Sequence, residues 1–164
     1  MEAVVVRAVT YDRNEARISL AGVPDTPGVA AKVFAPLASA GIVVDMIIQN
    51  ASREEGRNDL TFTVPRAATV EAQDIMSGIC TEMGAREVKA DDCIAKISVV
   101  GVGMRSHTGV ASKMFETLSL HGINIQMIST SEIKISVIVA ERYVELAVRV
   151  LHEAFGLSVT GDEG

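Results

Sequence analysis

Aromatic residues are scarce in this chain of 164 residues: tryptophan is absent, and aromatic residues together make up 4%. Hydrophobic residues nevertheless account for 48%, so we expect cores built from valine, isoleucine, alanine, leucine and methionine. This length suffices for one ordinary domain or two small ones. Few rings are available to stack on bases, and the formal net charge is −6. Both features disfavour a nucleic-acid partner.

Cysteine and histidine are also few, which argues against disulfides and metal sites. Cys80 and Cys93 show no metal-binding spacing and are predicted to be free thiols. His107, His121 and His152 are scattered, with no carboxylate or cysteine at ligand spacing. No stretch resembles a signal peptide or approaches the roughly 18 apolar residues of a membrane-spanning helix. We therefore expect a cytoplasmic protein with no membrane segment, no metal and no cofactor.

The chain does contain an internal repeat. Residues 16–23 (ARISLAGV) align with residues 95–102 (AKISVVGV), and five of the eight positions are identical. Residues 28–47 align with residues 109–128, and ten of the twenty positions are identical. Such self-similarity predicts a duplicated structural unit of roughly 75 to 80 residues.

Each unit reads as strand, helix, strand, strand, helix, strand. With right-handed crossovers, this order predicts an α+β fold in which an antiparallel sheet carries both helices on one face, the ferredoxin-like βαββαβ arrangement. In the first unit, residues 42–49 are predicted to form a buried strand, and Gly41 to end the first helix. Pro36 falls inside that helix, and we place it on the outer face. The two helices are expected to bury Val29, Val33, Phe34, Leu37 and Ala38, and Val70, Ile75, Ile79 and Met83.

The second unit lacks a convincing last strand, because residues 156–164 (GLSVTGDEG) are short and bracketed by glycine. Conversely, the β-branched N-terminal segment has no partner in the first unit. We predict that this N-terminal strand completes the sheet of the second unit. The first domain then spans residues 14–92, and the second spans residues 93–160 together with residues 2–11.

A polar turn, Asp25-Thr26-Pro27-Gly28, precedes the first helix. Asp25 or Thr26 can act as its N-cap, and Pro27 suits the first helical position. The same geometry leaves backbone amides at Gly28, Val29 and Ala30 available for an anion at the positive end of the helix dipole. The residues alone leave a capped helix and a ligand site equally open. Gln49, at the end of the following strand, is expected to point toward the same rim.

The second copy of the turn differs, because residues 104–108 (MRSHT) replace the acidic sequence. Gly101 and Gly103 suggest a dinucleotide-binding loop, but Ser106 stands where its third glycine belongs, so we set that reading aside. A small ferredoxin-like enzyme of the acyl phosphate hydrolase type would need an arginine in its phosphate-binding turn, and Arg105 is a candidate. A scaffold subunit without any ligand is the other alternative.

Five stretches, GVPDTPGVAAKVF, VDMIIQN, ISVVGVGMRSHTGVASKMF, NIQMISTSEIKISVIV and LHEAF, together resemble the paired ACT domains of aspartate kinases, in particular the separate regulatory β subunit. The resemblance covers almost the whole chain. It implies a regulatory chain without catalytic residues of its own, which pairs as a homodimer through its ACT domains and binds a catalytic α subunit. It further implies feedback inhibition of aspartate phosphorylation by threonine and, in many members, lysine.

The resemblance also implies where the effector binds, in a seam between the first domain of one chain and the second domain of another. The residues that it assigns to the effector site are Asp25, Thr26, Pro27, Gly28, Val29, Ala30 and Gln49, with Asn124 and Ile125 from the partner. An equivalent second seam would use Val110 and Ala111 with Val44 and Asp45. Ser52, Thr61, Ser131 and Glu132 match positions near the effector rim or the domain contact.

Overall fold

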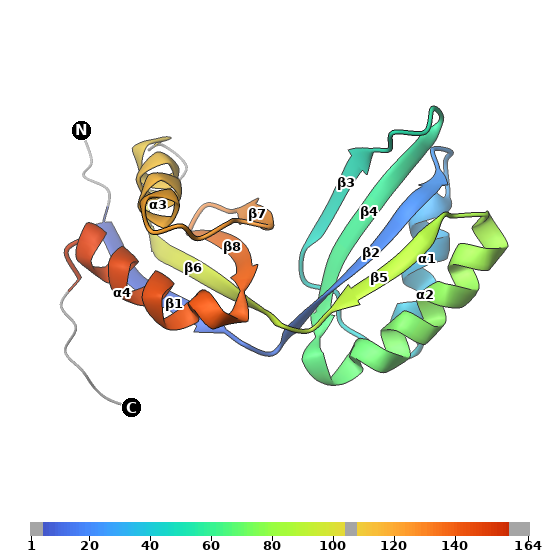
Figure 1. Cartoon of the computed structure of the whole chain (residues 1–164), viewed down its shortest axis with the longest axis horizontal. Coiled ribbons are helices and arrows are strands. Elements are labelled where there is room, and N and C mark those ends of the chain that lie inside the picture. Colours follow the sequence, from blue (N-terminus) through green and yellow to red (C-terminus); the bar gives the residue numbers. More distant parts are fainter. Residues whose placement is uncertain (1–4, 104–107, 158–164) are drawn as a thin grey trace. The chain divides into compact units, whose positions relative to one another are not determined.

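The computed structural model describes residues 5–103 and 108–157 (Figure 1). Arg105 and Ser106 lie outside these ranges, and so does most of the segment 156–164 that follows the last helix. The helices and strands are β1 (Val5–Asp12), β2 (Glu15–Pro24), α1 (Val29–Ser39), β3 (Ile47–Ala51), β4 (Arg57–Pro65), α2 (Thr69–Met83), β5 (Glu87–Asp91), β6 (Ile94–Val102), α3 (Thr108–Leu120), β7 (Met127–Thr130), β8 (Lys134–Ala140) and α4 (Val144–Ala154). Short 3₁₀ turns, Arg66–Ala68 and Glu141–Tyr143, precede α2 and α4.

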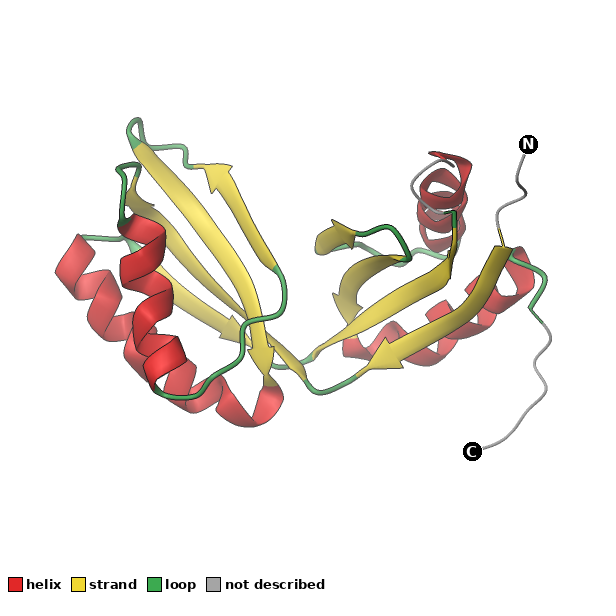
Figure 2. Ribbon diagram, turned by 180° about the vertical axis from the view of Figure 1, so that it is seen from behind, coloured by secondary structure: helices red, strands yellow, loops and turns green. Residues whose placement is uncertain are grey.

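The chain divides into two compact units, which we call the first unit (residues 14–92) and the second unit (residues 1–13 and 93–164). The first contains a sheet of strand order β3-β4-β2-β5, and the second a sheet of order β1-β6-β8-β7. All strand pairs in both sheets are antiparallel. Each unit carries its two helices on one face of its sheet (Figure 2). The predicted fold class, two ferredoxin-like units, is confirmed.

The N-terminal strand β1 belongs to the sheet of the second unit. It pairs along its length with β6, and the register runs from Val5 opposite Val102 to Asp12 opposite Lys96, with a bulge between Val6 and Ala8. Val9 of this strand is buried in the core of the second unit. The strand therefore fills the position that the last strand of a ferredoxin-like unit normally takes, as the sequence predicted.

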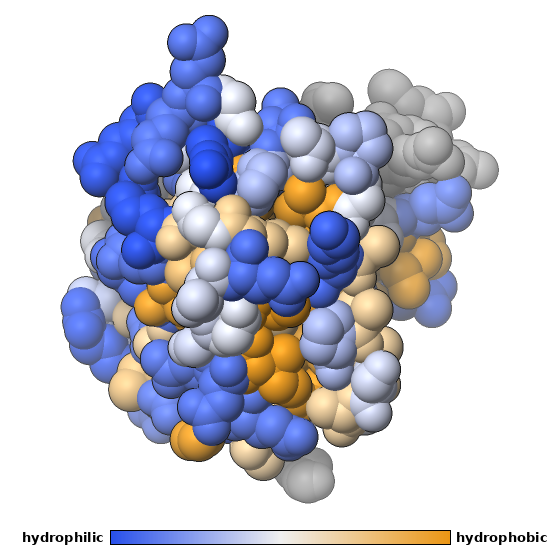
Figure 3. Space-filling view, turned by 90° about the vertical axis from the view of Figure 1, so that its right-hand side faces the viewer, coloured by the Kyte–Doolittle hydropathy of each residue, from blue (hydrophilic) through white to orange (hydrophobic). Residues whose placement is uncertain are grey.

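Each core lies between the sheet and its helices. In the first unit, α1 contributes Val33 and Leu37, and the ring of Phe34 meets that of Phe62 edge to face at 5.2 Å. In the second unit, α3 contributes Met114 and Leu118. Figure 3 views the first unit from its helix side, where hydrophilic residues cover much of the surface and apolar patches lie between them. Within the described residues, no helix is both long enough and apolar enough to cross a membrane.

The buried face of α2 differs from the predicted one. Val70 is 72% exposed, whereas Ala72 and Met76 are completely buried. Ile75, Ile79 and Met83 pack only at the margin of the core. The small side chain of Ala72 lets the helix approach the sheet closely, so the centre of the contact lies beside the row of large apolar residues. Ala38 of α1 is likewise exposed, not buried as expected.

Residues 42–49 are not the buried strand that their apolar sequence predicted. Strand β3 begins only at Ile47 and lies at the edge of its sheet, which leaves Ile47 53% exposed. The preceding segment is held from one side, because the Met46 amide donates to Thr63 Oγ1 at 3.0 Å. The Asp45 amide donates to the Thr63 carbonyl at 3.1 Å. An edge strand with exposed apolar residues has the same apolar sequence as a buried strand, but it pairs with a neighbouring strand on one side only. The sequence therefore did not distinguish the two.

Helix α1 ends at Ser39, and Gly41, the predicted terminator, follows its C-cap, Ala40. Gly41 has φ 75°, and the amides of Gly41 and Ile42 donate to the carbonyls of Ala38 and Leu37. This pairing is a Schellman motif, which needs a residue in the left-handed conformation. Pro36 lies within the helix and is half-buried, not on the outer face.

Candidate functional site

The turn before α1 is closed by its own backbone and not by a side chain. The helix begins at Val29 with Gly28 as its N-cap, at φ 90° and ψ −9°, and no side chain caps it. The Val29 amide donates to the Thr26 carbonyl at 3.4 Å. These angles and the Pro27-Gly28 sequence fit a type II turn, which takes proline second and glycine third. The prediction that Asp25 or Thr26 caps the helix, with Pro27 as its first residue, is therefore wrong.

The missing side-chain cap leaves backbone donors at the start of α1. Within the described chain, the amides of Gly28, Ala30 and Ala31 have no hydrogen-bond acceptor, and all three residues are exposed. The Val29 amide, predicted to be available as well, is engaged by Thr26. Orphan amides at a helix start form a local concentration of positive potential. Ala31 was not anticipated, because the helix was expected to begin two residues earlier.

Asp25 is held in place by the start of β4 and by the loop that precedes it. Its carboxylate oxygen Oδ1 accepts a hydrogen bond from Asn58 Nδ2 at 2.9 Å. Its backbone amide donates to the Gly56 carbonyl at 3.0 Å. Asn58 and Gly56 lie more than thirty positions from Asp25 in the chain. Sequence analysis therefore missed Asn58. The exposed carboxylate thus has a defined position in the turn that leads into α1.

The end of β2 is held by hydrogen bonds from the start of β4. Gly22 lies at a bulge in β2, where its amide donates to Asp59 Oδ1 at 2.9 Å. The Arg57 guanidinium donates to the Gly22 carbonyl at 3.0 Å. Arg86 forms an ion pair with Glu54 at 3.1 Å. Arg57 and Asn58, at the end of the segment SREEGRN (residues 52–58), therefore help to fix the position of the turn.

Gln49 lies on edge strand β3, opposite Leu60 of β4. Directly opposite residues of antiparallel strands point to the same face, and Leu60 is buried beneath the helices. The exposed Gln49 side chain is therefore on the helix face, the face to which α1 belongs. Thr61 points to the other face, where its hydroxyl donates to Ser19 Oγ at 3.3 Å. The structure does not bring Thr61 together with Gln49.

Ser52 and Ser131 occupy corresponding places at the start of the hairpin loop in each unit. Ser52 Oγ accepts from the Glu54 amide at 3.3 Å, and Ser131 Oγ accepts from the Lys134 amide at 3.2 Å. These bonds shape the loops, which is a structural role compatible with modulation of a nearby site. Glu132 is exposed in the second loop.

In the second unit, Asn124 and Ile125 follow α3 on the way to β7. Asn124 is exposed and Ile125 half-buried, and with Phe115 and Ser119 they line a shallow hollow of about 410 Å³.

The residues predicted for the second seam lie mostly in or against the cores. Val110 in the first turn of α3 is 6% exposed, and Ala111 packs beside it. Val44 packs against the core of the first unit, whereas Asp45 is exposed. The side chains of Val110 and Ala111 are therefore committed to packing, and only their backbone remains for a ligand.

Comparison with known proteins decides the family. The model of the ACT domain matches the chain twice, over residues 17–77 and 97–155. The chain belongs to the ACT domain family. Both matches fall within the two structural units, so each unit is one ACT domain, with β1 added to the second. The aspartate kinase of Pseudomonas fluorescens is 53% identical over all of this chain, and Ask_LysC of Stutzerimonas stutzeri is 54% identical over 96% of it.

Solved structures agree with this assignment. A structure of aspartokinase alpha and beta subunits matches with a TM-score of 0.87 and 52% identity, over 93% of this chain and 100% of the matched chain. The ligand-free regulatory subunit of aspartate kinase from Thermus thermophilus matches with a TM-score of 0.86 and 45% identity, over 92% and 98%. The ACT pair is thus of the aspartate kinase regulatory type. It spans about two fifths of the length of the curated relatives.

Proposed function

We propose that this ACT pair is the amino-acid sensor of an aspartate kinase, and that threonine, alone or together with lysine, is its feedback effector. The observation that carries the proposal is the start of α1, where the exposed amides of Gly28, Ala30 and Ala31 accompany the Asp25 carboxylate. A free amino acid carries a carboxylate and an ammonium group. The amides suit the carboxylate, and Asp25 suits the ammonium group.

Gln49 supplies the part of the site that reads the effector side chain. Its amide can donate to and accept from a hydroxyl, which threonine offers. Because Gln49 lies on an edge strand, a second copy of the chain has access to that edge. We propose that Asn124 and Ile125 of the second copy close the site, which makes the homodimer part of the sensor. The hollow beside these two residues supports this assignment.

The second seam is proposed as a weaker site. Val110 and Ala111 would contribute backbone amides only, because their side chains pack into the core. Val44 and Asp45 of the other copy would form the opposite wall. No counterpart of Asp25 follows β6 in the sequence, where methionine and arginine stand in its place.

Regulation follows from preferential binding to the paired state. An effector that contacts two copies stabilises their association by mass action. Coupling to the catalytic subunit or catalytic part of the kinase would have the ordinary allosteric size of about 1–3 kcal/mol. We propose α1 as the transmitter, because it begins at the effector turn and any shift there moves the whole helix.

Calorimetric titration of the chain with each of the twenty amino acids tests this function. We expect saturable heat with threonine, and a higher melting temperature and dimer fraction when threonine is present. Gln49→Ala should weaken threonine binding about five- to twentyfold, a loss of about 1–2 kcal/mol, while the circular dichroism spectrum stays unchanged. Asn50→Ala, a change to the next residue on the opposite face, is the matched control.

Two results would contradict the proposal. One is identical threonine binding by the wild type and Gln49→Ala, which would remove the amide from the site. The other is the absence of saturable heat with every amino acid, which would favour a scaffold that holds no ligand.

A further inference from the structure

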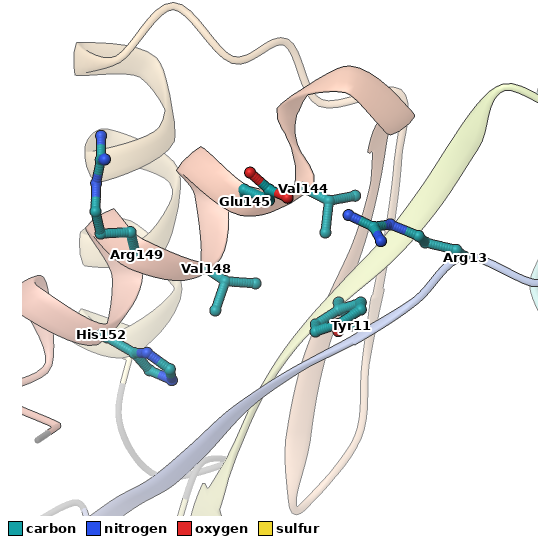
Figure 4. A pocket seen from close by; sticks show the side chains of 7 residues that line it. All are labelled: Tyr11, Arg13, Val144, Glu145, Val148, Arg149 and His152. Carbon is teal, nitrogen blue, oxygen red and sulfur yellow. The ribbon is translucent and has the colours of Figure 1, made fainter. Parts of the chain in front are cut away.

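A second concave surface lies in the second unit, at the sheet edge opposite the one proposed for the effector. The strand order β1-β6-β8-β7 places β7, which follows Asn124 and Ile125, at one edge and β1 at the other. Between β1 and α4 runs a groove of about 320 Å³ (Figure 4). This volume falls in the range of small-molecule sites in proteins. Nothing in the proposed sensing function uses this groove.

The floor of the groove is apolar. Tyr11 from β1 faces Val144 and Val148 from α4, as Figure 4 shows. Tyr11 is 55% exposed, although the chain has only six aromatic residues, two tyrosines and four phenylalanines. An aromatic ring left half in water beside aliphatic side chains gains free energy when a further apolar surface covers it.

The rim of the groove is cationic in a protein that is acidic overall. The Arg13 guanidinium lies over the Tyr11 ring, 5.4 Å from its centroid, at one end of the groove. His152 lies at the other end, and Arg149 projects from the outer wall. Within the described part of the chain, no carboxylate pairs with Arg13 or Arg149. The lining contains a single acid, Glu145, in the first turn of α4.

We propose that this groove binds a small carboxylate with a flat apolar body, of the aryl-alkanoate kind. The apolar body would cover Tyr11 and Val148, beside the buried Val144. The carboxylate would take the hydrogen-bond donors of Arg13, a guanidinium already oriented by its ring contact. The local excess of positive charge against the net charge of −6 selects an anion over a cation or a neutral ligand.

Methyl NMR on the whole chain, with 3-phenylpropionate as the probe, tests the proposal. We expect saturable shifts of the Val144 and Val148 methyl groups. Acetate, 3-phenylpropanol and 3-phenylpropylamine should each bind at least fivefold more weakly, because each lacks the apolar body or the negative charge. Arg13→Gln should weaken 3-phenylpropionate binding about five- to tenfold.

Arg142→Gln is the matched control, because Arg142 also lies over a tyrosine ring, 4.8 Å from the centroid of Tyr143, but does not line the groove. It should leave the affinity unchanged, and so should Gln49→Ala, which alters the proposed effector site alone. Val148→Asp, which introduces a negative charge into the floor, should abolish the shift of the remaining reporter, the Val144 methyl groups.

Equal affinity for 3-phenylpropanol, or wild-type affinity in Arg13→Gln, would overturn the proposal of an anion site. Shifts without saturation would do the same. If Gln49→Ala weakened 3-phenylpropionate as strongly as Arg13→Gln did, the probe would be reporting on the effector site, and the groove would lose its assignment.

Discussion

Replacement of Gly28 by alanine separates backbone geometry from side-chain contact at the turn before α1, our proposed effector site. Gly28 has φ 90°, and a Cβ added there would meet no atom within 4 Å. The cost of the substitution is therefore conformational, about 1–2 kcal/mol for a left-handed residue that is not glycine. Alanine also restricts the unfolded chain, which returns about 0.4–1 kcal/mol. The difference between these two ranges is a net loss of about 0–1.6 kcal/mol in the free energy of unfolding, and we expect a value of about 1 kcal/mol.

Gly78 in the middle of α2 provides a control of opposite sign. It belongs to the same unit, has no positive φ, and also has open space where a Cβ would lie. Gly78→Ala should therefore stabilise the first unit by about 0.5–1 kcal/mol, because alanine loses less entropy than glycine in a helix. The two substitutions add the same methyl group, and only the backbone conformation at each site distinguishes them.

Urea unfolding followed by circular dichroism measures both changes. Thermal unfolding is a second measurement. For a unit of about 80 residues, a change of 1 kcal/mol in the free energy of unfolding shifts the melting temperature by roughly 4–8 °C, so the two variants should differ by several degrees. Gly28→Ala should also weaken threonine binding, because the turn can no longer present its amides. The reasoning is refuted if Gly28→Ala is as stable as Gly78→Ala and binds threonine normally.

Two other contacts make similar tests. Asn58→Ala removes the hydrogen bond to Asp25 and should weaken threonine binding about threefold to tenfold in calorimetry, with a loss of stability under about 1 kcal/mol because the pair is exposed; undiminished affinity would show that Asp25 needs no support. Thr63→Val removes the buried acceptor of the Met46 amide and should cost about 1–2 kcal/mol in urea unfolding. Thr61→Val, which removes a long, half-buried bond on the same strand, should cost less than about 0.5 kcal/mol, and equal costs would count against the Met46 contact.

The arrangement of strands was predictable because strand edges must be satisfied. An unpartnered β-branched segment at the N-terminus and a missing last strand in the second unit each leave one backbone edge unpaired. Pairing of the N-terminal segment with the second unit satisfies both edges at once, and β1 does pair with β6. Apolar periodicity identified the helices for the same reason, since a helix in a small unit has to bury one side.

Where prediction failed, two local solutions competed. For the turn before α1, Asp25 and Thr26 are good N-caps, yet Pro27-Gly28 is also a good type II turn, and the turn is what forms. For α2, the row of large apolar residues and the row containing Ala72 and Met76 were both plausible core faces. The decision depended on how closely the helix approaches the sheet, which periodicity does not report.

Asn58 was beyond reach of sequence analysis for a different reason. Its contact with Asp25 joins residues 33 positions apart. It exists because β4 pairs with β2 as far as the end of β2, where Asn58 lies opposite Val23. The corresponding loop of the second unit is shorter and is closed by Ser131 and Lys134. Alignment of the two repeats therefore did not single out Asn58.

The two repeats differ most where a ligand would bind. Gly28 and Gly109 align in sequence, but Gly28 is a left-handed N-cap, whereas Gly109 lies inside α3 without a positive φ. An alanine at position 109 would therefore be tolerated, although the aligned change at position 28 would not. The aligned core positions remain apolar, as Val33 with Met114 and Leu37 with Leu118 show. The Pro27-Gly28 sequence has no counterpart before α3, where residues 104–108 read MRSHT. This difference in sequence supports our proposal that the site at the start of α1 is the stronger of the two.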